Sequence, residues 1–261
     1  MKITRAWIVA AATLTLASAA LAEVKTKEIE YTQGEAPLQG YLAWDDALPG
    51  KRPGVIVVHE WWGHNPHARH QAERLAQAGY VAFALDMYGK GKVTTHPADA
   101  QAFMAEALKD PAALDARFKA AREQLVADPH VDPSRLAAIG YCFGGGVVLA
   151  QARAGADLKA VVTFHGSLAT DHPAEKGKVK AQILVLHGAA DPMVNAAQVA
   201  ALEKEMKAAG ARYRVILYPG AKHSFTNPAA DSAGVPGLEY SAEADRKSWA
   251  AMLALFKTAL K

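Results

Sequence analysis

The chain has 261 residues, of which 51% are hydrophobic and 21% charged, and its formal net charge at pH 7 is +3. This length and apolar content are sufficient for one globular domain whose core needs no disulfide or metal in order to fold. The near-neutral charge balance excludes the electrostatic footprint that nucleic acids or anionic membranes require, so we expect a small-molecule partner.

The first 22 residues have the three parts of a secretory signal peptide. Lys2 and Arg5 give a basic start, residues 7–21 form an apolar run, and Ala20-Leu21-Ala22 is a small-residue cleavage pattern. The run is shorter than the ~20 strongly apolar residues of a spanning helix, which argues against an uncleaved anchor and against stable membrane insertion. We therefore predict export across the inner membrane to the periplasm. Cleavage lowers the 29 basic side chains to 27, against 26 acidic ones.

Beyond the signal peptide, strand and helix patterns alternate through a single predicted domain, residues 23–261. Short continuous apolar runs are typical of buried parallel strands, while residues such as Asn195 and Gly210 are typical helix caps. We expect strands at 25–32, 39–43, 54–59, 80–85, 135–141, 159–164, 182–187 and 212–218, and helices at 67–78, 111–127, 144–154, 195–209 and 241–260. This order predicts an α/β fold, a mostly parallel central sheet with helices on both faces.

Ligands of such sheets bind at the carboxyl ends of the strands, so residues that directly follow strands are the candidates for chemistry. Side chains with reactive or titratable groups occupy four of these positions: Glu60 beside Trp61, Cys142 beside Phe143, Asp191, and His223.

Cys142 is the centre of a nucleophile elbow, Gly140-Tyr141-Cys142-Phe143-Gly144, between a predicted strand and a predicted helix. The tight turn needs small residues two positions either side of the nucleophile. The backbone N–H of Phe143, at the start of the helix, is an expected oxyanion donor. As the only cysteine of an exported chain, Cys142 has no intramolecular disulfide partner, so it is either buried and inert or kept for its reactivity. The elbow favours reactivity.

Asp191 and His223 follow Cys142 in the order nucleophile, acid, base that this class of turn requires. His223 is the predicted base, and Asp191 is predicted to orient it. The alternatives are that Asp191 caps the helix beginning near Asn195 and that His223 is a surface loop residue.

Glu60 and Trp61 directly follow the strand at 54–59. A carboxylate beside a thiol can hold or accept its proton, so Glu60 is a catalytic candidate, and the N–H of Trp61 is the expected second oxyanion donor. The alternative is a structural Glu60 whose carboxylate fixes its loop.

Four segments together resemble one known family. They are His59-Glu60-Trp61-Trp62-Gly63, Gly79-Tyr80-Val81-Ala82 leading to Asp86-Met87-Tyr88, the elbow extended to Gly145, and Gly220-Ala221-Lys222-His223-Ser224-Phe225. With this set the chain is similar to the dienelactone hydrolase family from about Ile29 to Phe256. The resemblance implies an α/β-hydrolase fold, a triad of Cys142, His223 and Asp191, no metal or organic cofactor, and a thiol that is held neutral by Glu60 until substrate binds.

The chain departs from that family where substrate is selected. Dienelactone-cleaving members hold the substrate carboxylate with arginines, one of them four residues after the catalytic histidine, and here that residue is Asn227. No arginine lies between Arg74 and Arg117. Since arginine binds carboxylates in a bidentate manner and asparagine does not, we expect an ester or lactone other than the dienelactone. Trp62, Tyr88 and Asn227 are candidates for substrate contact.

Three other functions are compatible with parts of the sequence. The cluster of His59, Glu60, His64, His67 and His70 suggests a metal, but its spacing does not match H-E-x-x-H and Pro66 interrupts a helix there. A redox role for the lone cysteine would need an external thiol. A catalytically silent binding protein with a hydrolase fold is the third alternative.

Overall fold

The computed structural model describes residues 23–261, and the predicted signal peptide at residues 1–22 lies outside them. The described chain is built on an eight-stranded sheet with the strand order β1-β2-β4-β3-β5-β6-β7-β8. The pairs β1–β2 and β2–β4 are antiparallel, and all later neighbours are parallel. The strands are β1 (Val24–Gln33), β2 (Ala36–Asp45), β3 (Arg52–Val58), β4 (Val81–Ala84), β5 (Val131–Tyr141), β6 (Ala160–Phe164), β7 (Gln182–Gly188) and β8 (Tyr213–Tyr218).

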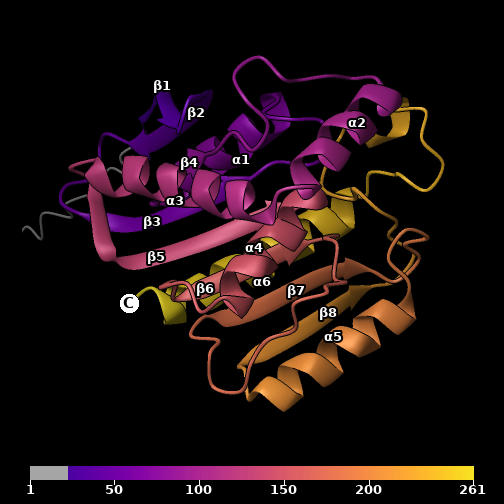
Figure 1. Ribbon diagram of the computed structural model, residues 1–261. Helices are drawn as coiled ribbons and strands as arrows, with labels where there is room; N and C mark the ends of the chain where they lie inside the picture. The colour runs from indigo at the N-terminus through magenta and orange to yellow at the C-terminus, as the bar shows by residue number, and fades with distance from the viewer. Residues whose placement is uncertain (1–22) are drawn as a thin grey trace, which may run out of the picture.

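Helices cover both faces of this sheet (Figure 1). They are α1 (Pro66–Gln77), α2 (Pro97–Leu108), α3 (Pro111–Ala127), α4 (Phe143–Arg153), α5 (Ala196–Ala209) and α6 (Ala242–Ala259), with a short 3-10 turn at Ala230–Ser232. The core is divided by the sheet into two apolar layers. One contains α3, α4 and α5, and the other contains α1 and α6.

Strand β3 shows why the parallel strands contain continuous apolar runs. Its side chains alternate between the two layers: Ile56 and Val58 pack with α3 and α4, whereas Val55 and Val57 pack with α1 and α6. All four side chains are fully buried. A strand covered on both faces must therefore be apolar at every position, which is the pattern the sequence shows.

The predicted α/β architecture is confirmed, and all thirteen expected elements are present with small shifts at their ends. One helix, α2 at Pro97–Leu108, lies in a segment for which the sequence predicted no element. Its N-cap, His96, makes no side-chain capping bond, and Ala100 is its single fully buried residue. A helix with so little buried surface has no apolar stripe to mark it in the sequence.

The described residues contain neither a candidate membrane span nor a candidate metal site. No helix among residues 23–261 is long and apolar enough to cross a bilayer. In the same residues, no group of three or more His, Cys, Asp or Glu side chains is arranged to bind a metal ion, the cluster around His59 and His64 included. His59 instead contacts the backbone, with Nδ1 near the Glu60 carbonyl and Nε2 accepting from the N–H of Met87 at 3.2 Å.

Candidate active site

Cys142 lies in the turn between the end of β5 and the start of α4. Its φ of 52° is in the left-handed region, which a non-glycine residue adopts only under strain. A Cβ on Gly140 would stand 2.1 Å from the carbonyl oxygen of Gly144, so the turn closes only because Gly140 has no side chain. The strained turn is held by the Cys142 N–H, which donates to the Phe164 carbonyl at 3.1 Å. The half-buried thiol is thereby presented above the carboxyl edge of the sheet.

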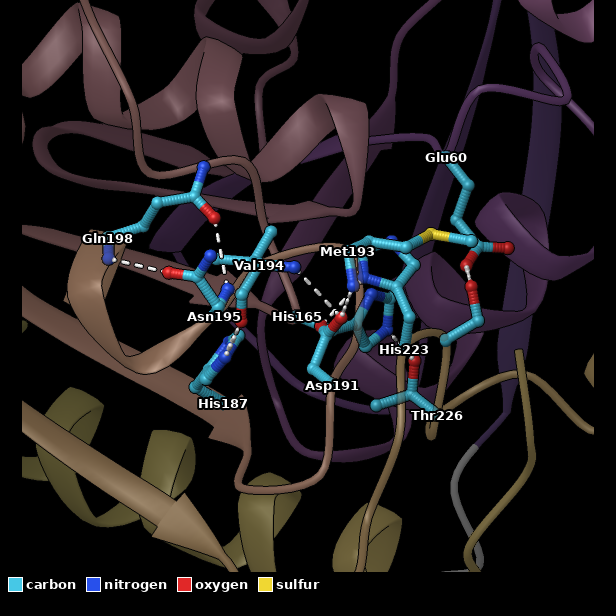
Figure 2. A network of polar contacts seen from close by, with 11 residues as sticks. Glu60, His165, His187, Asp191, Met193, Val194, Asn195, Gln198, His223 and Thr226 are labelled. Carbon is cyan, nitrogen blue, oxygen red and sulfur yellow. Dashed lines mark hydrogen bonds and ion pairs between the residues drawn. The ribbon is translucent and has the colours of Figure 1, made fainter. Parts of the chain in front are cut away.

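Asp191 and His223 meet in the loops that follow β7 and β8. The two side chains are joined by a contact of 2.8 Å between Asp191 Oδ2 and His223 Nδ1, and both are buried (Figure 2). The other carboxylate oxygen accepts from the N–H groups of Met193 at 2.8 Å and Val194 at 3.0 Å. Burial acts to raise the pKa of the Asp191 carboxyl, but these hydrogen bonds, led by the one from His223, outweigh it and lower that pKa. Asp191 is therefore a fixed anion.

The two alternatives considered for these residues do not describe their positions. Helix α5 is capped by Asn195, whose side chain accepts from the N–H groups of Ala197 and Gln198 in a complete capping box. Asp191 is not part of that cap. His223 is 3% exposed, so it is not a solvated loop residue.

Cys142 and His223 line one cavity of about 400 Å³, which we call the thiol pocket. Since Nδ1 of His223 is bound to Asp191, the opposite ring nitrogen, Nε2, is left for the thiol. Burial favours a neutral imidazole, but the Cys142 sulfur and the Asp191 carboxylate outweigh it and raise the pKa of His223 to about 10. The arrangement therefore favours an imidazolium beside the sulfur at neutral pH.

Glu60 follows β3 and is 1% exposed, but its carboxylate is not held by the thiol. Oε1 accepts from the Ser224 hydroxyl at 2.6 Å, and Oε2 accepts from the Asn227 amide at 2.5 Å. Within residues 23–261 no hydrogen bond joins Glu60 to Cys142 in this structure, and the role of Glu60 toward the thiol stays a prediction. Both donors belong to the loop that carries His223, and Glu60 ties that loop to the end of β3.

The two expected oxyanion donors lie on either side of the elbow. Phe143 is the first residue of α4, and Trp61 is in the turn after β3, where the Gly63 N–H donates to the Glu60 carbonyl at 3.4 Å. No partner in the described chain accepts a hydrogen bond from the backbone N–H of Trp61 or of Phe143. Both groups are thus free to bind a developing negative charge.

The three predicted substrate contacts have different surroundings. Trp62 lines a second cavity, and its ring meets that of Trp61 with centroids 4.8 Å apart. Tyr88 is buried, lines neither the thiol pocket nor the second cavity, and packs on the ring of Phe143, with centroids 5.4 Å apart. Asn227 also lines the second cavity, and its side-chain amide donates to Glu60.

The sequence analysis did not assign roles to His165 and Ser224. His165 follows β6, its Nε2 lies 2.8 Å from the Thr226 hydroxyl, and its ring packs edge-on against His223 at 5.2 Å. Burial and the neighbouring His223 hold the pKa of His165 well below its ordinary value, so this ring is neutral. The position of His165 directly after a strand was a usable signal for it. Nothing in the sequence marks Ser224 as a partner of Glu60.

The profile of the dienelactone hydrolase family matches residues 38–260. The chain belongs to the dienelactone hydrolase family. Protein usf of Aquifex pyrophilus is 31% identical to it over 207 residues, which cover 76% of this chain and 86% of that protein. The solved structure m3DLH is 42% identical, with a TM-score of 0.87 and coverage of 91% of this chain and 99% of that one. A dienelactone hydrolase-like promiscuous phosphotriesterase from metagenomic libraries is 39% identical, with the same TM-score and coverage.

Membership of the dienelactone hydrolase family, together with the mostly parallel sheet, makes the chain a hydrolase with the α/β-hydrolase fold. No Lys, Arg, Asp or Glu lines the thiol pocket. Among the described residues, the pocket of this dienelactone hydrolase family member therefore has no lysine or arginine to receive a substrate carboxylate.

Proposed function

We propose that the chain hydrolyses an uncharged carboxylic ester or lactone, with Cys142 as nucleophile, His223 as acid and base, and Asp191 as the residue that orients His223. The observation that carries the proposal is the 2.8 Å contact between Asp191 and His223 in a pocket that His223 shares with Cys142. The absence of Lys, Arg, Asp and Glu from the lining of that pocket supports an uncharged substrate.

In the first half of the reaction, Sγ of Cys142 attacks the substrate carbonyl carbon. The carbonyl oxygen becomes an anion and is bound by the N–H groups of Trp61 and Phe143. The bond to the leaving oxygen breaks, and that oxygen takes the proton from Nε2 of His223. The products of this half are an alcohol or enol and a thioester on Cys142.

In the second half, His223 removes a proton from water, and the resulting hydroxide attacks the thioester carbonyl. The bond between carbon and Sγ breaks, which releases the acid and regenerates the thiolate beside the imidazolium. Asp191 keeps Nδ1 protonated throughout, so that Nε2 performs both transfers. A thiolate is readily expelled from the first intermediate, so activated esters, such as aryl and enol esters, are preferred over amides.

The test is hydrolysis of p-nitrophenyl acetate by the purified protein, by Cys142→Ala and by Asp191→Asn. We expect no turnover above background for Cys142→Ala and a loss of about four orders of magnitude in kcat for Asp191→Asn, because the orienting charge disappears. Intact-mass detection of an acetyl group on Cys142 identifies the intermediate. Unchanged turnover in Cys142→Ala would refute the nucleophile assignment.

The same variants test a second substrate class. The 39% identical relative is a promiscuous phosphotriesterase, and a neutral phosphotriester presents an uncharged, activated centre similar to that of an aryl ester. Hydrolysis of a p-nitrophenyl dialkyl phosphate that depends on Cys142 would extend the proposal to that class.

Export is a separate part of the proposal. The expected processing site precedes Glu23, so the mass of the protein recovered from the periplasm of an expressing bacterium should correspond to a chain that begins at that residue. Recovery of the unprocessed chain from the cytoplasm alone would contradict it.

A further inference from the structure

A second cavity of about 480 Å³ lies beside the thiol pocket, between the start of α1 and the segment 225–240. We call it the apolar pocket. Its lining contains no Lys, Arg, Asp or Glu and consists of Trp62, Asn65, Pro66, His67, His70, Val93, Thr94, Thr95, Ser224, Asn227, Pro228, Ala229, Ala230, Ser232, Ala233 and Leu238. A cavity of this size and composition is typical of a site for an uncharged organic group.

Leu238 lies at the border of the two cavities, because it lines both. Its position is fixed by the backbone beside the proposed base: the His223 N–H donates to the Gly237 carbonyl at 3.1 Å, and the Glu239 N–H donates to the His223 carbonyl at 3.1 Å. The neighbouring residues Trp61 and Trp62 line different cavities: Trp61 lines the thiol pocket, and Trp62 lines the apolar pocket. One leucine therefore stands between the reacting groups and the apolar pocket.

The place of His223 indicates which part of an ester faces Leu238. His223 delivers its proton to the leaving oxygen, so that oxygen must lie against His223, and Leu238 is paired with His223 through the backbone. The group attached to the leaving oxygen then extends toward Leu238. The acyl group is directed to the other walls of the thiol pocket, where Met104, Leu168 and Val194 lie.

Resting on the proposed function, we propose that the apolar pocket is the subsite for the alcohol part of the substrate, and that Leu238 determines how far this part extends from the scissile bond. The alcohol part it accepts is an uncharged aryl or alkyl group. Ser224 and Asn227 form a polar border of the pocket, and directly behind them is the buried Glu60 carboxylate that they bind. An anionic alcohol part would be repelled by that carboxylate and would find no cation in the lining.

The experiment uses two ester series with matched chemistry. In the first, phenyl acetate is extended on the alcohol side as p-ethyl-, p-butyl- and p-hexylphenyl acetate, which lengthens the leaving group with little change in its reactivity. In the second, the phenyl ester is extended on the acyl side from acetate to hexanoate. For the wild type we expect kcat/KM in the alcohol series to rise about threefold to fourfold for each methylene that enters the apolar pocket.

Two substitutions change the pocket in opposite directions. Ala233→Phe places a ring in the pocket from its half-buried wall, and the ratio of kcat/KM for p-hexylphenyl acetate to that for phenyl acetate should fall at least tenfold. Leu238→Ala removes the partition, and the same ratio should rise. The matched control is Ala200→Phe, on the exposed face of α5, which should leave both series unchanged. An equal length dependence in the wild type and in Ala233→Phe overturns the proposal, as does an effect confined to the acyl series.

A binding measurement separates this proposal from the proposed function. With Cys142→Ala, p-hexylphenol should alter tryptophan fluorescence by binding next to Trp62, and Ala233→Phe introduced into this variant should weaken that binding at least tenfold. If the wild type hydrolyses none of the esters but p-hexylphenol binds in this way, the proposed function fails and the subsite stands. If phenyl acetate is hydrolysed but neither binding nor selectivity depends on the apolar pocket, the proposed function stands and the subsite proposal fails.

Discussion

Replacing Glu60 by Gln tests whether its carboxylate holds the loop that carries His223. The carboxylate is 1% exposed and accepts two hydrogen bonds, from Ser224 at 2.6 Å and from Asn227 at 2.5 Å. Glutamine has the same shape, but only one of its two terminal atoms can accept. The Asn227 amide cannot simply turn round, because its oxygen already accepts from the Ala229 N–H at 3.0 Å. The glutamine nitrogen must then face Ser224, whose hydroxyl oxygen can accept from it, so Glu60→Gln replaces two hydrogen bonds to a buried charge by two neutral ones.

A hydrogen bond to a charged group contributes about 1.5–3 kcal/mol to stability and a neutral one about 0.5–1.5 kcal/mol, so the two weakened bonds should together lower the stability by about 1.5–3 kcal/mol. A domain of this size loses roughly 2–4 °C in Tm for each kcal/mol of stability lost. The Tm of Glu60→Gln should therefore lie about 3–12 °C below that of the wild type. Because the loop carries His223, kcat for p-nitrophenyl acetate should fall by about tenfold to a hundredfold, while KM changes little. Circular dichroism melts and steady-state kinetics measure the two effects.

A double-mutant cycle with Asn227→Ala distinguishes this contact from a general loss of stability. If Glu60 and Asn227 act on each other, the double variant should lose at least about 1 kcal/mol less than the sum of the two single variants. A matched cycle of Glu60→Gln with Ser232→Ala, on the exposed 3-10 turn, should be additive. Additive losses for Glu60 with Asn227, or a shifted pH profile of Cys142 alkylation with an unchanged Tm, would refute the reasoning and return Glu60 to the role of thiol partner.

Two further predictions concern the elbow and the base. Gly140→Ala should lower the free energy of unfolding by at least about 1–3 kcal/mol in a denaturant titration and abolish turnover, because the new Cβ would lie 2.1 Å from the Gly144 carbonyl oxygen. In the control Gly146→Ala, the nearest atom to the new Cβ is 3.2 Å away, so the loss of stability should be small. Equal losses in both would show that the close approach is not what requires glycine. In Cys142→Ala, the pKa of His223 should fall below about 10, since the sulfur is one of the groups that raise it. An NMR titration of the imidazole checks this, and a value that stays near 10 would assign the whole rise to Asp191.

The architecture was predictable from the sequence because burial leaves a local pattern. In parallel strands such as β3, successive residues from Val55 to Val58 are all apolar, since both faces of the strand are covered. Helix α5 begins after Asn195 and ends before Gly210, whose φ of 68° is the left-handed value that favours glycine at a helix end. Helix α2 left no such pattern, because it lies on the surface and its N-cap residue makes no capping bond.

The partners of Glu60 could not be predicted in the same way. Glu60 is separated from Ser224 by 164 positions and from Asn227 by 167, so their contact depends on how the loops after β3 and β8 pack. The sequence identified Asn227 only as a departure from the arginine of dienelactone-cleaving relatives. The structure gives that departure a physical meaning, since an uncharged amide now satisfies the carboxylate that the resemblance assigns to the thiol.

Backbone strain separates the site from the rest of the described chain. Three non-glycine residues of the described chain have positive φ, namely Cys142 at 52°, His165 at 40° and Ser224 at 56°. Such conformations cost about 1–3 kcal/mol each and persist only where the surroundings enforce them. Cys142 and His165 are enforced by the sheet edge, through bonds from their N–H groups to the carbonyls of Phe164 at 3.1 Å and Leu186 at 2.8 Å. Glycine would relieve the strain at each position but would remove the thiol, the imidazole packed on His223 and the hydroxyl bound to Glu60, so the strain is the cost of placing these three groups near the proposed base.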